Sequence, residues 1–203
     1  MKVYLVRHGE TYTNATLCHT GWADIPLTAQ GMRDAMAAGA LLQGISFDHI
    51  YASDLRRAVQ TEKIAMQGAE CECSPLIREL NVGCLAGHYV KDCLAKYGEE
   101  YVQNKKRLDY SPYGGETYDA FFARVASFLK QLEEKDYETV AIFCHGGVIR
   151  MIADIIFGIF VPRSTLACDN GSVTQIEYKN GSWCVLEWNH KDRSEKFANF
   201  DAV

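Results

Sequence analysis

The sequence lacks any uninterrupted apolar stretch that is long enough to span a bilayer. The apolar run of residues 148–161 is broken by Arg150, Asp154 and Gly158, a pattern typical of a helix in a protein core. Residues 1–6 are too short for the apolar part of a signal peptide, and they fit a buried strand better. We therefore expect no membrane association and a cytoplasmic location.

An excess of positive charge is also absent. The 203 residues carry a formal net charge of -5 at pH 7. This balance argues against a general binder of nucleic acids or of membrane surfaces. An anionic ligand would therefore have to bind to a local cluster of positive charge.

Closely spaced cysteines of the kind that bind zinc are nearly missing, although the chain has 8 cysteines. The only close pair is Cys71 and Cys73, and its spacing differs from that of the usual zinc knuckle. A disulfide framework is not expected, because the chain is not small and no secretory signal precedes it. We predict reduced thiols and no bound metal, with a zinc site as the weaker alternative.

The sequence does contain short apolar runs that alternate with helical patterns, which is typical of an α/β domain with a largely parallel sheet. Thr28 has the residue type of a helix N-cap, and Asn180-Gly181 predicts a β-hairpin. No linker or repeat divides the chain, so we predict a single domain over residues 1–203. The expected strands are 2–6, 47–52, 70–73, 139–144, 172–178 and 183–188, and the expected helices are 28–42, 54–66, 90–97, part of 99–107, 117–134 and 147–157.

Polar and basic residues follow three of the predicted strands. Arg7 and His8 follow the first strand, Arg57 comes shortly after the second, and His145 with Gly146 follows a later one. Ligands of open α/β sheets bind outside the carboxyl ends of the strands, so we expect these groups to meet at one site. Arginine can bind two oxygens of a phosphoryl group at once, and glycine permits close backbone approach. The pattern predicts an anion site that needs no metal ion.

These segments resemble the histidine phosphatase superfamily, also called the phosphoglycerate mutase-like family. The resemblance extends in order from the first strand to about Trp188. It implies a three-layer sandwich in which helices cover both faces of a mostly parallel central sheet. The matching segments are residues 6–11 (VRHGET), 21–28 (GWADIPLT), 53–61 (SDLRRAVQT), 78–83 (RELNVG), 114–117 (GGET) and 144–150 (CHGGVIR).

The resemblance implies phosphoryl transfer through a phosphohistidine, with His8 as the nucleophile. The attacking nitrogen must be unprotonated, and nearby arginines favour the neutral imidazole. Arg7, Arg57 and His145 would hold the phosphoryl oxygens, a role that magnesium plays in many phosphoryl-transfer enzymes. Glu79 matches the family's general acid, which protonates the leaving oxygen and then activates water. No cofactor is implied.

Further matches concern phosphate binding. Asn14 matches a phosphate ligand of the family, and Thr20 and Gly21 match a hydroxyl and an amide contact. Gly146 lies beside the second histidine, where a close backbone approach is expected. Arg56 stands one position before the family's arginine, and we interpret it as a solvated residue on a helix face.

The shared core does not separate phosphatases from mutases. Residues 20–28 and 96–100 resemble the mutases, but the stretch between Glu79 and Gly114 is short for the additional mutase segment. We therefore predict a phosphomonoesterase for small molecules, with a phosphoglycerate mutase or a non-catalytic phosphate-binding module as alternatives. The sequence specifies neither the substrate nor the oligomeric state. Residues 85–113 are expected to cover the site. Four of their tyrosines are candidate contacts, although tyrosines in such a stretch are more often packing residues: Tyr89, Tyr101, Tyr110 and Tyr113.

Overall fold

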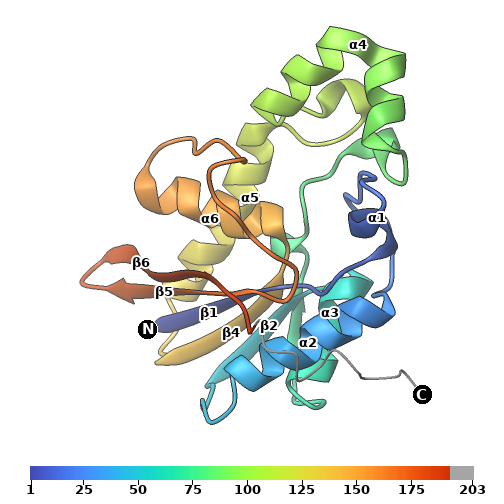
Figure 1. Cartoon of the computed structure of the whole chain (residues 1–203). Coiled ribbons are helices and arrows are strands. Elements are labelled where there is room, and N and C mark those ends of the chain that lie inside the picture. The colour runs from blue at the N-terminus through green and yellow to red at the C-terminus, as the bar shows by residue number, and fades with distance from the viewer. Residues whose placement is uncertain (193–203) are drawn as a thin grey trace.

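The computed structural model describes residues 1–192, so residues 193–203 of the predicted single domain lie outside the described residues. A six-stranded sheet has the order β3-β2-β4-β1-β5-β6 (Figure 1). The first four strands in this order are parallel to one another, whereas β5 is antiparallel to both of its neighbours, β1 and β6. The strands are β1 Lys2–Arg7, β2 His49–Ser53, β3 Glu72–Ser74, β4 Thr139–Cys144, β5 Val173–Lys179 and β6 Ser182–His190.

Helices cover both faces of this sheet. The pair α2 (Ala29–Leu41) and α3 (Arg56–Ala65) packs on one face, and the pair α5 (Tyr118–Glu133) and α6 (Gly146–Phe157) packs on the other (Figure 1). A longer helix, α4 (Val90–Arg107), lies at the top of the view, beyond the sheet. The predicted three-layer α/β sandwich is therefore confirmed.

The two cores of the sandwich arise from the alternation of side chains along the central strands. Val140 and Ile142 of β4 belong to the larger core, which also contains the inward residues of α5 and α6. Ala141 and Phe143 belong to the smaller core, together with Ala38 of α2. Because both faces of β4 are covered, its sequence is a continuous apolar run.

Most predicted elements are confirmed, with boundaries that shift by up to two residues. Thr28 caps α2 as predicted, because its side chain accepts the Gly31 N–H at 3.0 Å. The helix predicted from residue 54 begins only at Arg56, and Asp54 instead binds the guanidinium of Arg78. Four short elements were not predicted: α1 (Tyr12–Ala15) and the 3₁₀ turns η1 (Pro75–Ile77), η2 (Gly83–Leu85) and η3 (Ser111–Tyr113).

Two glycine positions confirm predicted breaks in regular structure. Gly98 has φ 59° and ψ -141°, so it divides α4 into the two helical segments that were predicted around it. Asn180 and Gly181 have φ values of 54° and 76°. Positive φ at both central residues is what a two-residue type I′ hairpin requires, and this turn joins β5 to β6.

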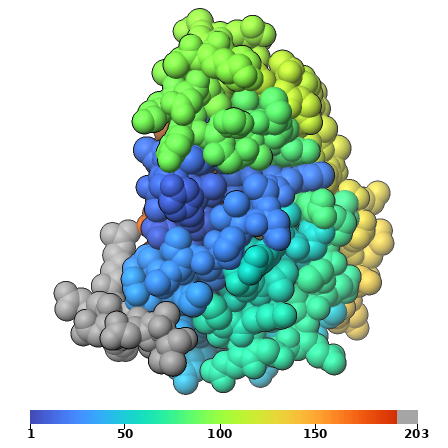
Figure 2. Space-filling view, turned by 90° about the vertical axis from the view of Figure 1, so that its right-hand side faces the viewer, coloured from blue at the N-terminus to red at the C-terminus, as the bar shows by residue number. Residues whose placement is uncertain are grey.

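The loop before α4 lies on the segment that follows α1. Val90 N–H donates to the Leu17 carbonyl at 3.0 Å, and His19 N–H donates to the His88 carbonyl at 2.9 Å. Figure 2 shows the green residues of this region directly above the blue residues of the N-terminal segment. Of the four tyrosines singled out in the sequence, three are buried packing residues, as expected: Tyr101, Tyr110 and Tyr113.

All eight cysteines are free thiols. Within residues 1–192, no helix combines the length and the apolar character that crossing a membrane requires. The same residues contain no group of three or more histidine, cysteine, aspartate or glutamate side chains arranged to hold a metal ion.

Candidate active site

The strand order brings the predicted residues together. β4 lies between β1 and β2, and all three strands are parallel, so their carboxyl ends are neighbours. His8 follows β1, Arg57 lies in the first turn of α3 after β2, and His145 follows β4. The rings of His8 and His145 are 5.1 Å apart, and Arg57 Nε lies 3.3 Å from His8 Nε2.

The two neighbours of the His8 ring determine its tautomer. Nδ1 lies 2.7 Å from the Gly9 carbonyl, which can only accept a hydrogen bond, so Nδ1 carries the proton. Arg57 Nε can only donate, so Nε2 is unprotonated and its lone pair accepts this hydrogen bond. Burial, followed by the charges of Arg57 and Arg7, holds the pKa of His8 well below its usual range. His8 is therefore a neutral imidazole whose unprotonated Nε2 faces a cation.

Arg57 is fully buried and connects His8 to the loop before α2. It donates to the Gly21 carbonyl at 2.8 Å and to the Ala23 carbonyl at 3.1 Å. Burial lowers the pKa of Arg57 to about 10, and the carboxylate of Glu79 acts in the opposite direction. The guanidinium therefore remains charged at neutral pH. The adjacent Arg56 is exposed, as predicted.

Arg7 places a second cation beside the start of α6. It donates to the Cys168 carbonyl, while its buried Nε has no partner among the described residues. A Cβ atom on Gly146 would lie 3.2 Å from Arg7 Nε and 3.1 Å from Arg150 Nη1. Glycine therefore leaves the room that the two guanidinium groups occupy. Arg150, whose pKa is lowered by burial, was not predicted to lie at the site, although it belongs to the same motif as His145.

Glu79 lies against the N-terminus of α6. Its Oε2 accepts the Gly147 N–H at 3.2 Å, and its Oε1 accepts the Leu80 N–H at 2.8 Å. Arg124 of α5 donates to three carbonyl oxygens of the segment that carries Glu79. Arg124 is itself paired with Glu116 at 2.8 Å. Sequence reasoning did not assign Arg124 to the site, and Glu116 was noted only as part of the GGET motif.

Asn14 and Thr20 lie in a polar network next to the His8 loop. Asn14 Oδ1 accepts the Thr11 N–H at 3.1 Å and the Asn170 amide N–H at 3.2 Å. The Asn14 amide nitrogen therefore points away from these two donors. The Thr20 hydroxyl lies 2.7 Å from that of Thr13. A direct contact of Asn14, Thr20, Gly21 or Gly146 with phosphate stays a prediction.

The turn that precedes β5 also supports the His8 loop. Asn170 donates to the His8 carbonyl at 2.9 Å, and the Gly171 N–H donates to the Arg7 carbonyl at 3.1 Å. Sequence reasoning did not assign this turn to the site. Its role was missed because the contact joins segments 162 positions apart in the chain.

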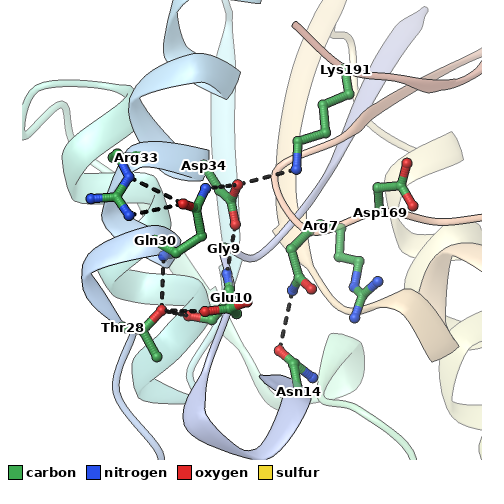
Figure 3. A network of polar contacts seen from close by, with 12 residues as sticks. Arg7, Gly9, Glu10, Asn14, Thr28, Gln30, Arg33, Asp34, Asp169 and Lys191 are labelled. Atoms are coloured by element: carbon green, nitrogen blue, oxygen red, sulfur yellow. Dashed lines mark hydrogen bonds and ion pairs between the residues drawn. The ribbon is translucent and has the colours of Figure 1, made fainter. Parts of the chain in front are cut away.

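Asp34 of α2 is a further residue that sequence reasoning did not identify. Its buried carboxylate accepts the Glu10 N–H at 3.0 Å and pairs with Lys191 at 3.1 Å (Figure 3). The Glu10 side chain accepts the Thr28 hydroxyl at 2.8 Å. Glu10 is therefore part of the frame that holds the loop, and Asp34 links this loop to the segment after β6.

A model of the histidine phosphatase superfamily (branch 1) matches residues 3–191. The chain belongs to the histidine phosphatase superfamily. The predicted family is thereby confirmed over nearly the whole chain. The match begins in β1 and extends just past β6, so it includes every segment on which the resemblance was based.

Known relatives of this histidine phosphatase include phosphatases and mutases. The adenosylcobalamin/alpha-ribazole phosphatase of Escherichia coli (strain K12) is 27% identical over 207 residues, which cover 100% of this chain and 98% of that protein. The 2,3-bisphosphoglycerate-dependent phosphoglycerate mutase of Azorhizobium caulinodans is 40% identical over 135 residues, which cover 63% of this chain and 66% of that protein.

Solved structures support the same fold. The crystal structure of the alpha-ribazole phosphatase from Shigella flexneri superimposes with a TM-score of 0.84 at 27% identity, covering 94% of this chain and 96% of that chain. The predicted phosphoglycerate mutase-like architecture is confirmed. The phosphatases among the relatives identify the chain as an enzyme, a phosphoric monoester hydrolase of the histidine phosphatase type.

Proposed function

We propose that this histidine phosphatase hydrolyses small phosphorylated metabolites, without a metal ion, through a phosphohistidine on His8. The observation that carries the proposal is the state of the His8 ring. Its Nδ1 proton is bound by the Gly9 carbonyl, and its Nε2 lone pair lies 3.3 Å from the Arg57 guanidinium. A neutral nucleophile beside a fixed cation is suited to attack on a phosphoryl group.

In the first step, His8 Nε2 attacks phosphorus in line, so that the N–P bond forms while the bond to the leaving oxygen breaks. Arg57 then donates to a phosphoryl oxygen instead of to Nε2. The buried Arg7 Nε and His145 Nδ1, which have no partner among the described residues, supply two further donors. Preformed donors and cations of this kind stabilise the charge of the transferring group.

Glu79 would act in both steps. In the first, its carboxyl proton passes to the leaving oxygen, which departs as an alcohol. In the second, the resulting carboxylate takes a proton from a water molecule while that water attacks phosphorus and the N–P bond breaks. Inorganic phosphate leaves, and His8 regains its lone pair. The position of Glu79 against the start of α6, near Arg57, supports this assignment.

A phosphoglycerate mutase is the second candidate, because the Azorhizobium mutase is 40% identical over the region that it matches. The phosphatase assignment is supported by the E. coli phosphatase, which aligns over 100% of this chain. A mutase must also protect its phosphohistidine from water until the phosphoryl group returns to a second acceptor.

Phosphate release from a panel of monoesters tests the proposal. The panel contains sugar phosphates, nucleotide-derived phosphates, phosphoglycerates and alpha-ribazole-5′-phosphate, the last chosen because of the E. coli and Shigella relatives. Turnover should persist in a metal chelator and be abolished by His8→Ala, while His190→Ala, an exposed histidine on β6, should leave it unchanged. Undiminished turnover in His8→Ala would exclude His8 as the nucleophile.

The mutase alternative needs its own assay. Interconversion of 3-phosphoglycerate is measured with and without 2,3-bisphosphoglycerate, and phosphate release is followed in the same samples. We expect phosphate release to exceed isomerisation. Efficient isomerisation with little phosphate release would replace the phosphatase assignment by the mutase.

A further inference from the structure

Ser53 is a buried polar residue at the carboxyl end of β2 that the proposed reaction does not yet use. Its side chain is fully buried, as is that of His145, and Ser53 Oγ lies 2.8 Å from His145 Nε2. β2 and β4 are parallel neighbours with Ala52 opposite Phe143. This register places the last residue of β2 next to the histidine that follows β4.

The Ser53 hydroxyl has two hydrogen-bonding neighbours, and only one of them, His145 Nε2, can accept its proton. The Leu55 N–H donates to Ser53 Oγ at 3.3 Å, so one lone pair of the hydroxyl is occupied. The remaining neighbour is His145 Nε2, which can accept the hydroxyl proton or donate its own. On the opposite side of the ring, His145 Nδ1 is buried and has no partner among the described residues.

The two tautomers of His145 have opposite consequences for a phosphoryl group. If Nε2 carried the proton, Nδ1 would direct a lone pair toward phosphoryl oxygens, which are also acceptors. If the Ser53 hydroxyl donates to Nε2, Nδ1 carries the proton and becomes a donor. Burial, followed by the charges of cations that include Arg57 and Arg7, holds the pKa of His145 well below its usual range, so the doubly protonated ring is not favoured.

We propose that Ser53 is a positioning residue that holds His145 as the Nδ1–H tautomer and thereby makes it a hydrogen-bond donor to the transferring phosphoryl group. The catalytic part of this inference rests on the proposed function, whereas the tautomer itself does not. Ser53 touches no reacting atom. It acts by donating its only proton to Nε2, the ring nitrogen that is not proposed to bind the phosphoryl group.

Ser74 provides a matched control. It lies at the end of the neighbouring strand β3, directly opposite Ser53, and its hydroxyl accepts the Leu76 N–H at 3.3 Å. Its backbone contact thus mirrors that of Ser53, and it makes no hydrogen bond to a histidine of residues 1–192. Ser74→Ala therefore removes the same kind of hydrogen bond to the backbone without removing a hydrogen bond to a histidine ring.

The first test determines the tautomer of the unmodified protein by NMR of nitrogen-labelled histidine, with the His145 signal assigned from its loss in His145→Gln. We expect a protonated Nδ1 and an unprotonated, hydrogen-bonded Nε2. Ser53→Ala should shift the signal toward the other tautomer, and Ser74→Ala should not. A protonated Nε2 in the unmodified protein would overturn the inference, whatever the outcome for His8→Ala.

The second test measures turnover. Ser53→Ala should lower kcat about 100-fold, the effect expected for loss of one preformed donor, with a much smaller change in KM. Ser53→Thr, which keeps the hydroxyl, should retain most of the activity if it folds, and Ser74→Ala should stay close to the unmodified enzyme. An unchanged kcat in folded Ser53→Ala would refute the positioning role. Because the NMR result does not depend on turnover, its failure is distinguishable from failure of the proposed function.

Discussion

Replacement of Arg57 by alanine, compared with the same change at Arg56, tests whether the cation beside His8 drives the reaction. The two arginines are adjacent in the first turn of α3 and carry the same charge. Arg57 is fully buried and contacts His8, whereas Arg56 is exposed. The pair therefore separates the effect of a specific contact from a general loss of positive charge.

Arg57→Ala should have three effects, on catalysis, on stability and on the pKa of His8. Loss of one preformed donor to the transferring group lowers kcat by about 10² to 10³, or roughly 3–4 kcal/mol of transition-state stabilisation. The carbonyls of Gly21 and Ala23 also lose their donors. Each carbonyl that water does not reach then destabilises the fold by about 1–3 kcal/mol. Finally, the charge of Arg57 lowers the pKa of His8, so its removal raises that pKa.

Steady-state kinetics from acidic to neutral pH, together with urea unfolding, measure all three effects. For Arg57→Ala we expect a kcat/KM that is about 10² to 10³ lower, reduced stability, and an acid limb of kcat/KM that moves to higher pH, because His8 is then protonated more readily. Arg56→Ala should stay within about twofold of the unmodified enzyme, as is usual for exposed side chains. Comparable losses in both variants, or a folded Arg57→Ala of nearly full activity, would refute the reasoning.

Two further predictions concern stability. Burial, followed by the charges of Lys105 and His88, lowers the pKa of His19 to about 4, so its contribution to stability should be lost as the pH falls from 6.5 toward 4. In urea unfolding, the difference between the unmodified protein and His19→Gln should therefore change by on the order of 1 kcal/mol per pH unit in this window, and a constant difference would contradict it. Gly31→Ala would favour the helix by about 1 kcal/mol, but its Cβ would lie 2.0 Å from the Glu10 carbonyl. We expect a lower Tm and a lower kcat, and a raised Tm at full activity would disprove this.

The parts of the fold that the sequence predicts well are those with strong local signals. The continuous apolar run of β4 was located correctly to the residue, and the inward side chains of α5 are buried as their spacing indicates. The start of α3, which was predicted two residues too early, lies where neighbouring side chains bind distant partners. Asp54 binds Arg78, and Ser53 binds His145. Local propensity carries no information about such contacts.

The same distinction applies to the site. The residues proposed to meet the phosphoryl group lie in short motifs at the ends of strands, so sequence order and the rules of parallel sheets bring them together. Their supports do not have this property. Asp34 binds the Glu10 N–H from another helix, and Asn170 binds the His8 carbonyl across 162 positions. These partners are specified by tertiary register, which no motif encodes.

The two central histidines illustrate what the geometry adds to the motifs. In sequence, His8 and His145 are alike, because each follows a parallel strand and precedes a glycine. In the structure, His8 Nδ1 meets a carbonyl, which only accepts, whereas His145 Nε2 meets a hydroxyl, which can donate. In the proposed mechanism, one ring therefore has a lone pair for attack, and the other has an N–H for binding. Burial and the charges of Arg57 and Arg7 lower the pKa of both rings, so the difference between their proposed roles depends on one oxygen atom beside each ring.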